Sequence, residues 1–332
     1  MEYRRFGNTG MNVSRLSLGA MTFGRGLDRG ESARVVDDAL DNGINFIDTA
    51  DSYFDSEEIL GEILTPDKRE RVFLATKVYR QFCRDGKAAR NSRVNILNSL
   101  ERSLRLLNTD YVDLYQLHHP DPDTPIQETL ETLDTIVKQG KARYVGVSNH
   151  YAWQMAHMLG EAKARGYEPI VSYQANYSIL DRQLEFEAIE FLRKFNIALM
   201  CYSPLSSGVL TGKYHTGQGI PEGSRATVIK YIEPYINDDT VGRIVEELKP
   251  IAAEQGLQLN QLAILWLLAK PEATTIILGG SRPEHFSQIY EIMDRTLPSE
   301  VVERIDALSE ARIYCQYLNQ GHRTAPALNP WA

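Results

Sequence analysis

Four ionisable side chains stand at or just after three short apolar segments in the N-terminal part of the chain. They are Asp48, Tyr53, Lys77 and His118. Where parallel strands close into a barrel, residues at the carboxyl ends of neighbouring strands face one common opening. We therefore expect these four side chains to converge on one spot.

This residue set is suited to moving a proton while a carbonyl group is reduced. A free tyrosine has a pKa of about 10, which is too high for a ready acid near neutral pH. A lysine cation beside Tyr53 would favour the phenolate and lower that pKa, and Asp48 would keep Lys77 charged and in place. His118 would hydrogen-bond the substrate oxygen. When a hydride reaches the carbonyl carbon, negative charge develops on the oxygen, and Tyr53 would protonate it.

Eight short apolar segments recur along the chain, and longer amphipathic segments separate them. Strands that alternate with helices predict parallel pairing with right-handed connections. Eight such units in about 300 residues predict an α/β fold, the (β/α)8 TIM barrel. A turn cluster at Gly7–Gly10 predicts an N-terminal β-hairpin between Tyr3–Phe6 and Met11–Ser14. The predicted barrel strands are Arg15–Leu18, Asn45–Asp48, Val72–Thr76, Val112–Leu117, Tyr144–Val147, Ile170–Gln174, Ile197–Tyr202 and Thr275–Leu278.

Some of the amphipathic segments carry their own helix signals. Apolar residues recur every three or four positions over Val94–Leu107, directly after Asn91 and Ser92, which are favoured helix caps. The same spacing predicts a later helix through Phe186, Ile189 and Leu192.

We expect residues 1–332 to form a single domain, with an irregular C-terminal tail over residues 313–332. From Ser203 to about Asp239 a long Gly- and Pro-rich loop follows the predicted seventh strand. Long loops in compact domains are usually functional, and the loops after the strands build the active site of a TIM barrel. The rival architecture, an open doubly wound sheet, normally carries G-x-G-x-x-G after its first strand. The glycines of Leu18–Gly26 lack that spacing.

Short motifs surround the four ionisable residues and continue in order along the chain. They are Asp48-Thr49-Ala50-Asp51-Ser52-Tyr53, Thr76-Lys77, Leu117-His118-His119-Pro120-Asp121, Gly146-Val147-Ser148-Asn149, Gln174-Ala175-Asn176-Tyr177-Ser178, Tyr202-Ser203-Pro204-Leu205, Leu210-Thr211-Gly212-Lys213-Tyr214 and Gly279-Gly280-Ser281-Arg282-Pro283-Glu284. From Tyr3 to about residue 308 the chain resembles the aldo-keto reductases, in their longer-loop microbial branch. The resemblance extends to the β subunits of voltage-gated potassium channels.

The resemblance implies a role for each matching residue. Asp48, Tyr53, Lys77 and His118 match the catalytic tetrad of the family. The remaining matches imply an NADP(H) site: Ser148, Asn149 and Gln174 for the nicotinamide carboxamide, Tyr202 for stacking on the nicotinamide ring, Ser203, Pro204, Leu205, Ser206, Ser207, Lys213 and Arg225 for the pyrophosphate loop, and Gly279, Ser281, Arg282, His285 and Gln288 for the adenosine 2′-phosphate and adenine.

Arg282 favours NADP over NAD as the cofactor, because a guanidinium binds a phosphate monoester through two parallel hydrogen bonds. Two neighbouring positions depart from the common pattern of the family. His285 stands where Gln is frequent, and Ile289 stands where Asn is frequent near the adenine.

Substrate specificity should depend on the loops around the opening of the barrel. The predicted pocket residues are Phe23, Phe54, Tyr79 and His119. Phe54 stands where the family commonly has Gly, so its bulk would narrow the pocket beside Tyr53. Strand alternation sends neighbouring side chains to opposite sides, which predicts that only one of His118 and His119 faces the opening. The expected substrate is a small aldehyde, ketone or alcohol, with sugar-derived carbonyls as one class suggested by the resemblance.

Three other functions compete with this interpretation. A metal-dependent hydrolase would use His118, His119, Asp48 and Asp51 as ligands, but adjacent histidines are awkward joint ligands, so no metal is predicted. A retaining glycosidase would need a pair of carboxylates, and no pair of strand-end glutamates appears. A regulatory subunit that binds NADP(H), like the channel β subunits, is the serious alternative to an enzyme.

Bulk properties agree with a cytoplasmic enzyme. The formal net charge of -8 argues against a nucleic-acid or anionic-membrane partner. The three cysteines, Cys83, Cys201 and Cys315, are far apart and odd in number, which fits a reducing compartment. The polar segment Met1–Gly10 shows no secretory signal, and Leu262–Ala269 is too short an apolar run to cross a bilayer. The oligomeric state has no sequence signal.

Overall fold

Eight parallel strands close into a barrel in the computed structural model, which describes residues 1–79, 90–214 and 232–314. The strands follow chain order around the barrel, and the last strand pairs with the first. They are β3 (Leu16–Gly19), β4 (Phe46–Asp48), β5 (Phe73–Val78), β6 (Val112–Leu117), β7 (Ala142–Ser148), β8 (Ile170–Asn176), β9 (Ala198–Tyr202) and β10 (Ala273–Leu278). The predicted TIM barrel is therefore confirmed, and all eight predicted strands are found within a few residues of their expected bounds.

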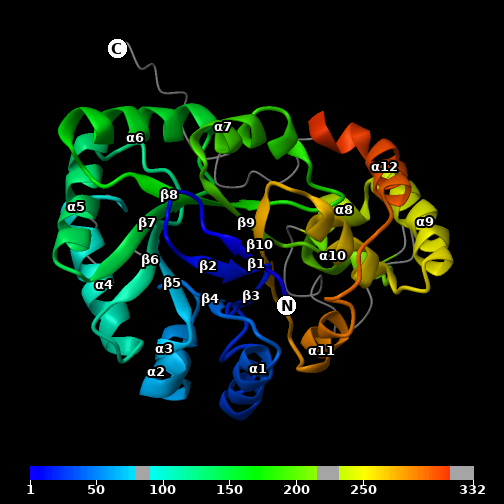
Figure 1. Cartoon of the computed structure of the whole chain (residues 1–332), viewed down its shortest axis with the longest axis horizontal. Helices are drawn as coiled ribbons and strands as arrows, with labels where there is room; N and C mark the ends of the chain where they lie inside the picture. Colours follow the sequence, from blue (N-terminus) through cyan, green and yellow to red (C-terminus); the bar gives the residue numbers. More distant parts are fainter. Residues whose placement is uncertain (80–89, 215–231, 315–332) are drawn as a thin grey trace.

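Helices surround the barrel on its outside (Figure 1). They are α1 (Arg29–Asp41), α2 (Ser56–Ile63), α3 (Pro66–Glu70), α4 (Arg93–Leu106), α5 (Ile126–Lys138), α6 (Ala152–Arg165), α7 (Ala188–Phe195), α8 (Glu233–Ile236), α9 (Asp239–Glu254), α10 (Leu259–Ala269), α11 (Glu284–Tyr290) and α12 (Ser299–Leu308). Short 3-10 helices are η1 (Gln183–Glu185), η2 (Ser206–Thr211) and η5 (Glu310–Tyr314). The apolar faces of the helices pack on the outer faces of the strands in one large core.

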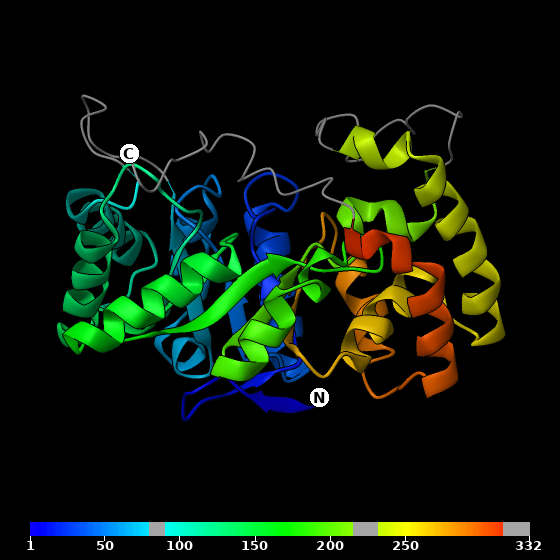
Figure 2. The same cartoon turned by 90° about the horizontal axis from the view of Figure 1, so that it is seen from above.

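The predicted hairpin consists of β1 (Tyr3–Arg5) and β2 (Asn12–Ser14), and it covers one end of the barrel (Figure 2). Phe6 follows β1 and inserts between the first residues of two barrel strands. Its ring centroid lies 5.8 Å from that of Phe46 and 5.1 Å from that of Phe73. The hairpin therefore closes the amino-terminal end, which leaves the carboxyl ends of the strands as the opening for a site.

Local signals placed some helix ends correctly and failed at another. The side chain of Ser92 accepts a hydrogen bond from the backbone N–H of Asn95 and caps α4, as predicted. The helix predicted through Phe186 begins only at Ala188. Phe186 lies outside it and is 72% exposed. Its apolar spacing was therefore misleading, because Phe186 follows η1 and belongs to no buried helix face.

The long loop after β9 contains η2 at its start and α8 near its end. Its middle, residues 215–231, lies outside the described residues, as do residues 315–332 of the predicted tail and the predicted pyrophosphate residue Arg225. Of the three cysteines only Cys201 is described, and its thiol is free and buried.

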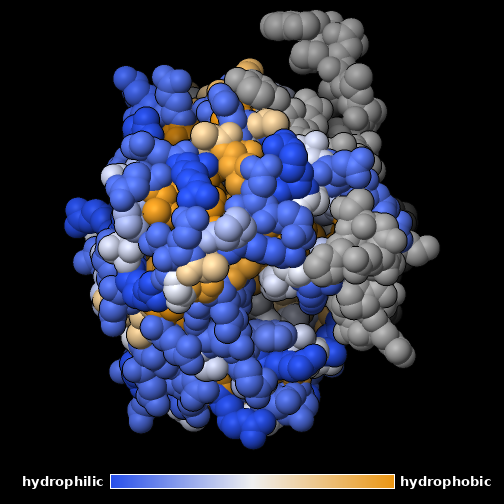
Figure 3. All heavy atoms as spheres, turned by 90° about the vertical axis from the view of Figure 1, so that its right-hand side faces the viewer, coloured by the Kyte–Doolittle hydropathy of each residue, from blue (hydrophilic) through white to orange (hydrophobic). Residues whose placement is uncertain are grey.

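The outer face near α9 and α12 is largely hydrophilic, and apolar side chains show there only between polar ones (Figure 3). No helix among the described residues combines the length and apolar character needed to span a bilayer.

Candidate active site

Lys77 lies at the centre of the predicted catalytic residues and is fully buried. Its Nζ donates to Oδ2 of Asp48 at 2.6 Å and to the carbonyl oxygen of Thr49 at 2.8 Å. The same Nζ lies 3.4 Å from the hydroxyl oxygen of Tyr53. The ends of β4 and β5 and the loop after β4 therefore bring three of the four residues into direct contact.

His118 lies beside this group, directly after β6. Its ring packs edge-on against the ring of Tyr53, with centroids 5.7 Å apart. The expectation that alternation separates His118 from His119 is wrong, because their rings stack at a centroid distance of 5.0 Å and an angle of 17°. β6 ends at Leu117, so both histidines lie beyond the strand, where the two-residue period no longer applies.

Burial lowers the pKa values of two residues of the site, Lys77 and His118. Complete burial lowers the pKa of Lys77, while the adjacent carboxylate of Asp48 opposes that shift. Burial also lowers the pKa of His118 well below its ordinary value, and the nearby charges of Lys77 and His119 act in the same direction. His118 is therefore a neutral imidazole at neutral pH, with one N–H to donate and one nitrogen to accept. Its Nδ1 has no hydrogen-bond partner among the described residues.

Two glutamine amides hold the second oxygen of Asp48. Nε2 of Gln174 donates to Oδ1 at 2.8 Å, and Nε2 of Gln116 lies 3.4 Å from the same atom. Gln174 is a predicted carboxamide-binding residue, so its amide links the predicted cofactor site to the predicted catalytic residues. Gln116 was not predicted as a site residue. Its position near the carboxyl end of a predicted strand was the available signal, since polar residues there face the opening of a TIM barrel.

The predicted nicotinamide residues lie side by side at the ends of β7, β8 and β9. The hydroxyl of Tyr202 donates to Oδ1 of Asn149 at 2.8 Å. Nδ2 of Asn149 donates to the carbonyl oxygen of His118 at 3.0 Å and to Oγ of Ser148 at 3.1 Å. Ser148 and Gln174 are register partners across the two strands. The backbone N–H of Asn149 donates to the carbonyl oxygen of Gln174 at 3.1 Å. The four predicted residues thus form one hydrogen-bonded group beside the predicted catalytic residues.

The predicted pyrophosphate loop, Ser203–Ser207 with Pro204 and Leu205, has an unusual backbone. Ser203, Ser206 and Ser207 have φ angles of 52°, 45° and 58°, and Gly208 follows with 97°. The backbone N–H groups of Ser206 and Gly208 donate to the carbonyl oxygens of Ser203 and Leu205 at 2.8 Å and 2.9 Å, so the loop folds back on itself in tight turns. Non-glycine residues in this region are strained and persist only where their surroundings hold them.

Two positively charged residues lie near His285: Lys213, further along the loop after β9, and Arg282, in the loop after β10. Burial lowers the pKa of His285, and the neighbouring charges of Arg282 and Lys213 add to that effect. The backbone N–H of Ser281 donates to Nδ1 of His285 at 3.3 Å. A side chain built at Gly279 would meet nothing within 4 Å, so the space beside it is open. Gln288 is half-buried, and Asn260 donates to its side-chain oxygen at 3.4 Å.

Comparison with known proteins now decides the family. The model of the aldo/keto reductase family matches residues 15–310. The chain belongs to the aldo/keto reductase family. It is accordingly an oxidoreductase.

Relatives of two kinds are similar over nearly the whole chain. The uncharacterized oxidoreductase YrpG of Bacillus subtilis (strain 168) is 33% identical, over 92% of this chain and 95% of its own length. The aldo-keto reductase YhdN of the same organism is 33% identical, over 94% and 95%. A probable voltage-gated potassium channel subunit beta of Oryza sativa subsp. japonica is 34% identical, over 94% and 98%. The resemblance inferred from the motifs is confirmed in both its parts.

Membership of an oxidoreductase family also decides against the two hydrolases considered as rivals. Within the described ranges, no three His, Cys, Asp or Glu side chains are placed to hold a metal ion.

The predicted substrate residues of this aldo/keto reductase differ in burial. Tyr79 lies beside both histidines, with its ring centroid 5.3 Å from that of His118 and 5.1 Å from that of His119. Phe54 is 56% exposed in the loop after β4, and the guanidinium of Arg25 lies over its ring at 4.8 Å. Phe23 is fully buried in the hydrophobic core, so we no longer propose it as a pocket residue.

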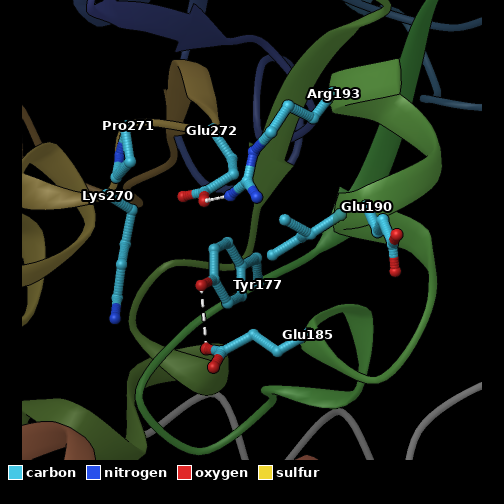
Figure 4. Close-up of a pocket in the computed structure, with 8 residues that line it drawn as sticks. Tyr177, Glu185, Glu190, Arg193, Lys270, Pro271 and Glu272 are labelled. Carbon is cyan, nitrogen blue, oxygen red and sulfur yellow. Dashed lines mark hydrogen bonds and ion pairs between the residues drawn. The ribbon is translucent and has the colours of Figure 1, made fainter. Parts of the chain in front are cut away.

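A separate hollow of about 300 Å³ lies on the outside of the barrel, between α7 and the start of β10 (Figure 4). Its polar side chains are largely paired with one another. The hydroxyl of Tyr177 donates to Oε1 of Glu185 at 2.8 Å, and Arg193 pairs with Glu272. None of the predicted site residues lines it, so it is no part of the candidate active site.

Proposed function

We propose that this aldo/keto reductase uses NADP(H) to reduce an aldehyde or ketone to an alcohol, with Tyr53 as the proton donor. The observation that carries the proposal is that the buried Lys77 contacts both Asp48 and Tyr53, at 2.6 Å and 3.4 Å. A desolvated lysine next to a tyrosine hydroxyl has little structural purpose, and perturbed buried groups of this kind cluster at functional sites.

In this proposal each residue of the site has a separate role in carbonyl reduction. The nicotinamide, when bound, supplies the hydride that reduces the carbonyl carbon. The N–H of neutral His118 donates to the carbonyl oxygen and orients it. Tyr53 gives its proton to that oxygen as negative charge develops there, and the cation of Lys77 stabilises the phenolate that remains. Asp48, held by Gln174 and Gln116, keeps Lys77 charged in its buried position.

The residues present fit the proposed cofactor. Asn149, Gln174 and Ser148 offer amide and hydroxyl groups for a carboxamide, and Tyr202 offers a ring beside them. Lys213 would supply a positive charge for the pyrophosphate, because its Nζ lies beside the serine loop, 3.5 Å from where a Cβ on Gly208 would be. Arg225, which lies outside the described residues, stays a predicted contact of the same loop.

Arg282 and Lys213 support a preference for NADP(H), since only NADP(H) carries an additional phosphate on the adenosine ribose. Both charges lie close enough to His285 to shift its pKa. Arg282→Ala should therefore weaken the binding of NADPH far more than that of NADH, because one bidentate phosphate contact is lost. An equal loss for the two nucleotides would remove Arg282 from the proposed 2′-phosphate site.

The first experiment is a titration of the full-length protein with NADPH and with NADH, followed by tryptophan fluorescence. Tight binding that is selective for NADPH would support the proposal and justify a panel of aryl aldehydes, simple ketones and sugar-derived carbonyls. Failure to bind either nucleotide would overturn it. If aryl aldehydes react and sugars show no rate, the sugar-derived class is excluded.

A second candidate function is favoured by one observation, the 34% identity to a probable voltage-gated potassium channel subunit beta. In that case the chain would bind NADP(H) and regulate a partner. Tight retention of NADPH without turnover of any carbonyl in the panel would favour this regulatory role, whereas rapid turnover would favour the enzyme.

A further inference from the structure

Asp51 carries a buried carboxylate that the proposed mechanism does not use, although it lies three residues after Asp48. It is 4% exposed and belongs to the loop after β4. The backbone N–H of Tyr79 donates to both of its side-chain oxygens, at 3.1 Å each. Its Oδ2 also accepts a hydrogen bond from the hydroxyl of Ser99, in α4, at 2.7 Å. One carboxylate therefore joins the loop after β4, the residue after β5 and a helix.

The backbone of Asp51 is held at the end of β5 as well. Its N–H donates to the carbonyl oxygen of Lys77 at 3.1 Å. Asp51 thus contacts β5 on both sides of its last residue, through the backbone at Lys77 and through the side chain at Tyr79. The same loop contains Tyr53, whose N–H donates to the carbonyl oxygen of Ala50 at 3.0 Å. The segment with the proposed proton donor and the end of β5 are therefore fixed relative to each other.

Tyr79 depends on this contact for its position. β5 ends at Val78, and beyond that point the carboxylate of Asp51, in place of a neighbouring strand, accepts the hydrogen bond of the Tyr79 N–H. The ring of Tyr79 lies 5.3 Å from that of His118 and 5.1 Å from that of His119, measured between centroids. The backbone contact with Asp51 therefore helps to decide where an aromatic wall stands beside the proposed catalytic histidine.

Asp51 also acts on the site through its charge. Burial lowers the pKa of Lys77, and the negative charge of Asp51 opposes that shift, after the larger contribution of Asp48. This electrostatic effect can be separated from the positional one by experiment. The hydroxyl of Ser99 orients the carboxylate of Asp51, and its removal leaves the charge of that carboxylate in place.

We propose that Asp51 is a positioning residue that holds Tyr79 against the two histidines and thereby sets the affinity for the carbonyl substrate. This inference rests on the proposed function, because it takes Tyr79 as a wall of the substrate pocket. The hydrogen bonds of the Asp51 carboxylate reach the backbone of Tyr79 and the side chain of Ser99, so it acts through Tyr79. Side chains that contact a substrate need such support, since a small displacement weakens binding.

The test measures the steady-state reduction of 4-nitrobenzaldehyde by the full-length protein at saturating NADPH. Ser99→Ala removes the orienting hydroxyl and keeps the charge of Asp51. Asp51→Asn removes the charge and keeps one acceptor oxygen. We expect the KM for the aldehyde to rise about 3- to 30-fold in each variant, a range that one lost hydrogen bond spans. The value of kcat should fall by a smaller factor, and the dissociation constant of NADPH should not change.

A double-mutant cycle with Tyr79→Ala tests whether Asp51 acts through Tyr79. Tyr79→Ala alone should raise the KM for the aldehyde, because the wall is lost. In that background Ser99→Ala should add little, since the ring whose position depends on Asp51 is absent. A merely structural role of the Asp51 contacts would give the same factor in both backgrounds, because independent effects are additive in free energy.

Tyr177→Phe is the matched control. Tyr177 is also buried, and its hydroxyl also donates to a carboxylate, that of Glu185, but this pair lines the outer hollow (Figure 4). The control should keep the KM and kcat of the wild type. If Asp51→Asn does not fold, Ser99→Ala decides the question, since it removes one hydroxyl and no charge.

The outcomes separate the two proposals. Wild-type protein that binds neither nucleotide, or that reduces no carbonyl, overturns the proposed function and the inference about Asp51 with it. An active wild type whose folded Ser99→Ala variant has the KM of the control overturns the inference about Asp51 alone. So does an equal effect of Ser99→Ala with and without the ring of Tyr79. A raised KM that disappears in the Tyr79→Ala background supports both proposals.

Discussion

At the scale of single residues, the candidate site is a charge pair removed from water. The side chains of Lys77 and Asp48 are 0% and 3% exposed. Removing one partner of a buried ion pair typically costs about 3–5 kcal/mol, because the other charge is left uncompensated. Stability alone gives little reason for such a pair, since an apolar replacement is often as stable. The contact of Lys77 with Tyr53 suggests instead that the pair serves proton transfer.

Tyr53→Phe should lower turnover of a carbonyl substrate by roughly 10²–10⁴-fold, the usual contribution of a general acid. The substitution keeps the ring against His118 and removes only the hydroxyl that Lys77 contacts. The dissociation constant of NADPH, measured by fluorescence in the same preparation, should change little. An unchanged turnover rate would rule out Tyr53 as the proton donor.

The buried histidine predicts how stability depends on pH. The pKa of His118 is lowered in the folded protein, whereas the unfolded chain has the ordinary value of about 6.5. Below that pH the unfolded state takes up a proton that the folded state resists, so the free energy of unfolding decreases as pH falls. The loss from one such group approaches about 1.4 kcal/mol per pH unit.

His118→Gln should therefore lose less stability than the wild type between pH 7 and pH 5.5, as measured by urea unfolding without nucleotide. The exposed His157 provides a control, His157→Gln, which removes an imidazole from the outer helix α6. Parallel pH dependences for the wild type and His118→Gln would contradict the burial argument.

At the scale of elements, strand register brings the proposed catalytic residues together. Asp48 pairs with Ala75 on β5, and Lys77 pairs with Gln116 on β6. Consecutive parallel strands therefore bring their carboxyl ends to one rim, and His118 follows one strand further round. Residues that are 70 positions apart at most along the chain become neighbours because the barrel keeps chain order.

The opposite end of the barrel depends on the hairpin. Phe6 is fully buried against Phe46 and Phe73, so Phe6→Ala would leave a cavity in the barrel interior. We expect a loss of about 3–5 kcal/mol in the free energy of unfolding, the usual cost of this truncation in a core. Urea unfolding measures it.

Met11→Ala is the control for that variant, because Met11 lies in the same hairpin and is 39% exposed. Surface substitutions of this kind usually change stability by less than about 0.5 kcal/mol. If both variants unfold at the same urea concentration, the packing of Phe6 against the barrel does not contribute to the free energy of unfolding.

At the scale of the whole molecule, the barrel divides stability from function. Apolar side chains around Phe6, Phe46 and Phe73 close the amino-terminal end. The carboxyl end holds the proposed catalytic residues, the amides at the strand ends and the strained serine loop. This division is general for TIM barrels, in which function lies in the loops after the strands. It explains why an enzyme and a channel subunit can share one fold with this chain.

Much of this was determined by the sequence alone. Eight apolar segments with intervening amphipathic helices determine a parallel barrel, and the positions of Asp48, Lys77 and His118 at strand ends follow from local pattern. The motifs around them identified the family. These features are local or periodic, so they can be recognised without knowing which segments meet.

Contacts between distant segments were decided only by the tertiary structure. The stacking of His118 on His119 depends on where β6 ends. Gln116 contacts Asp48, and Phe23 lies in the hydrophobic core. Both contacts depend on tertiary packing, which residue spacing along the chain does not reveal. Asp181 meets Ser206 and Tyr235 across 25 and 54 residues. The physical reason is that burial and hydrogen bonding depend on neighbours in space, which a chain acquires only when its elements pack.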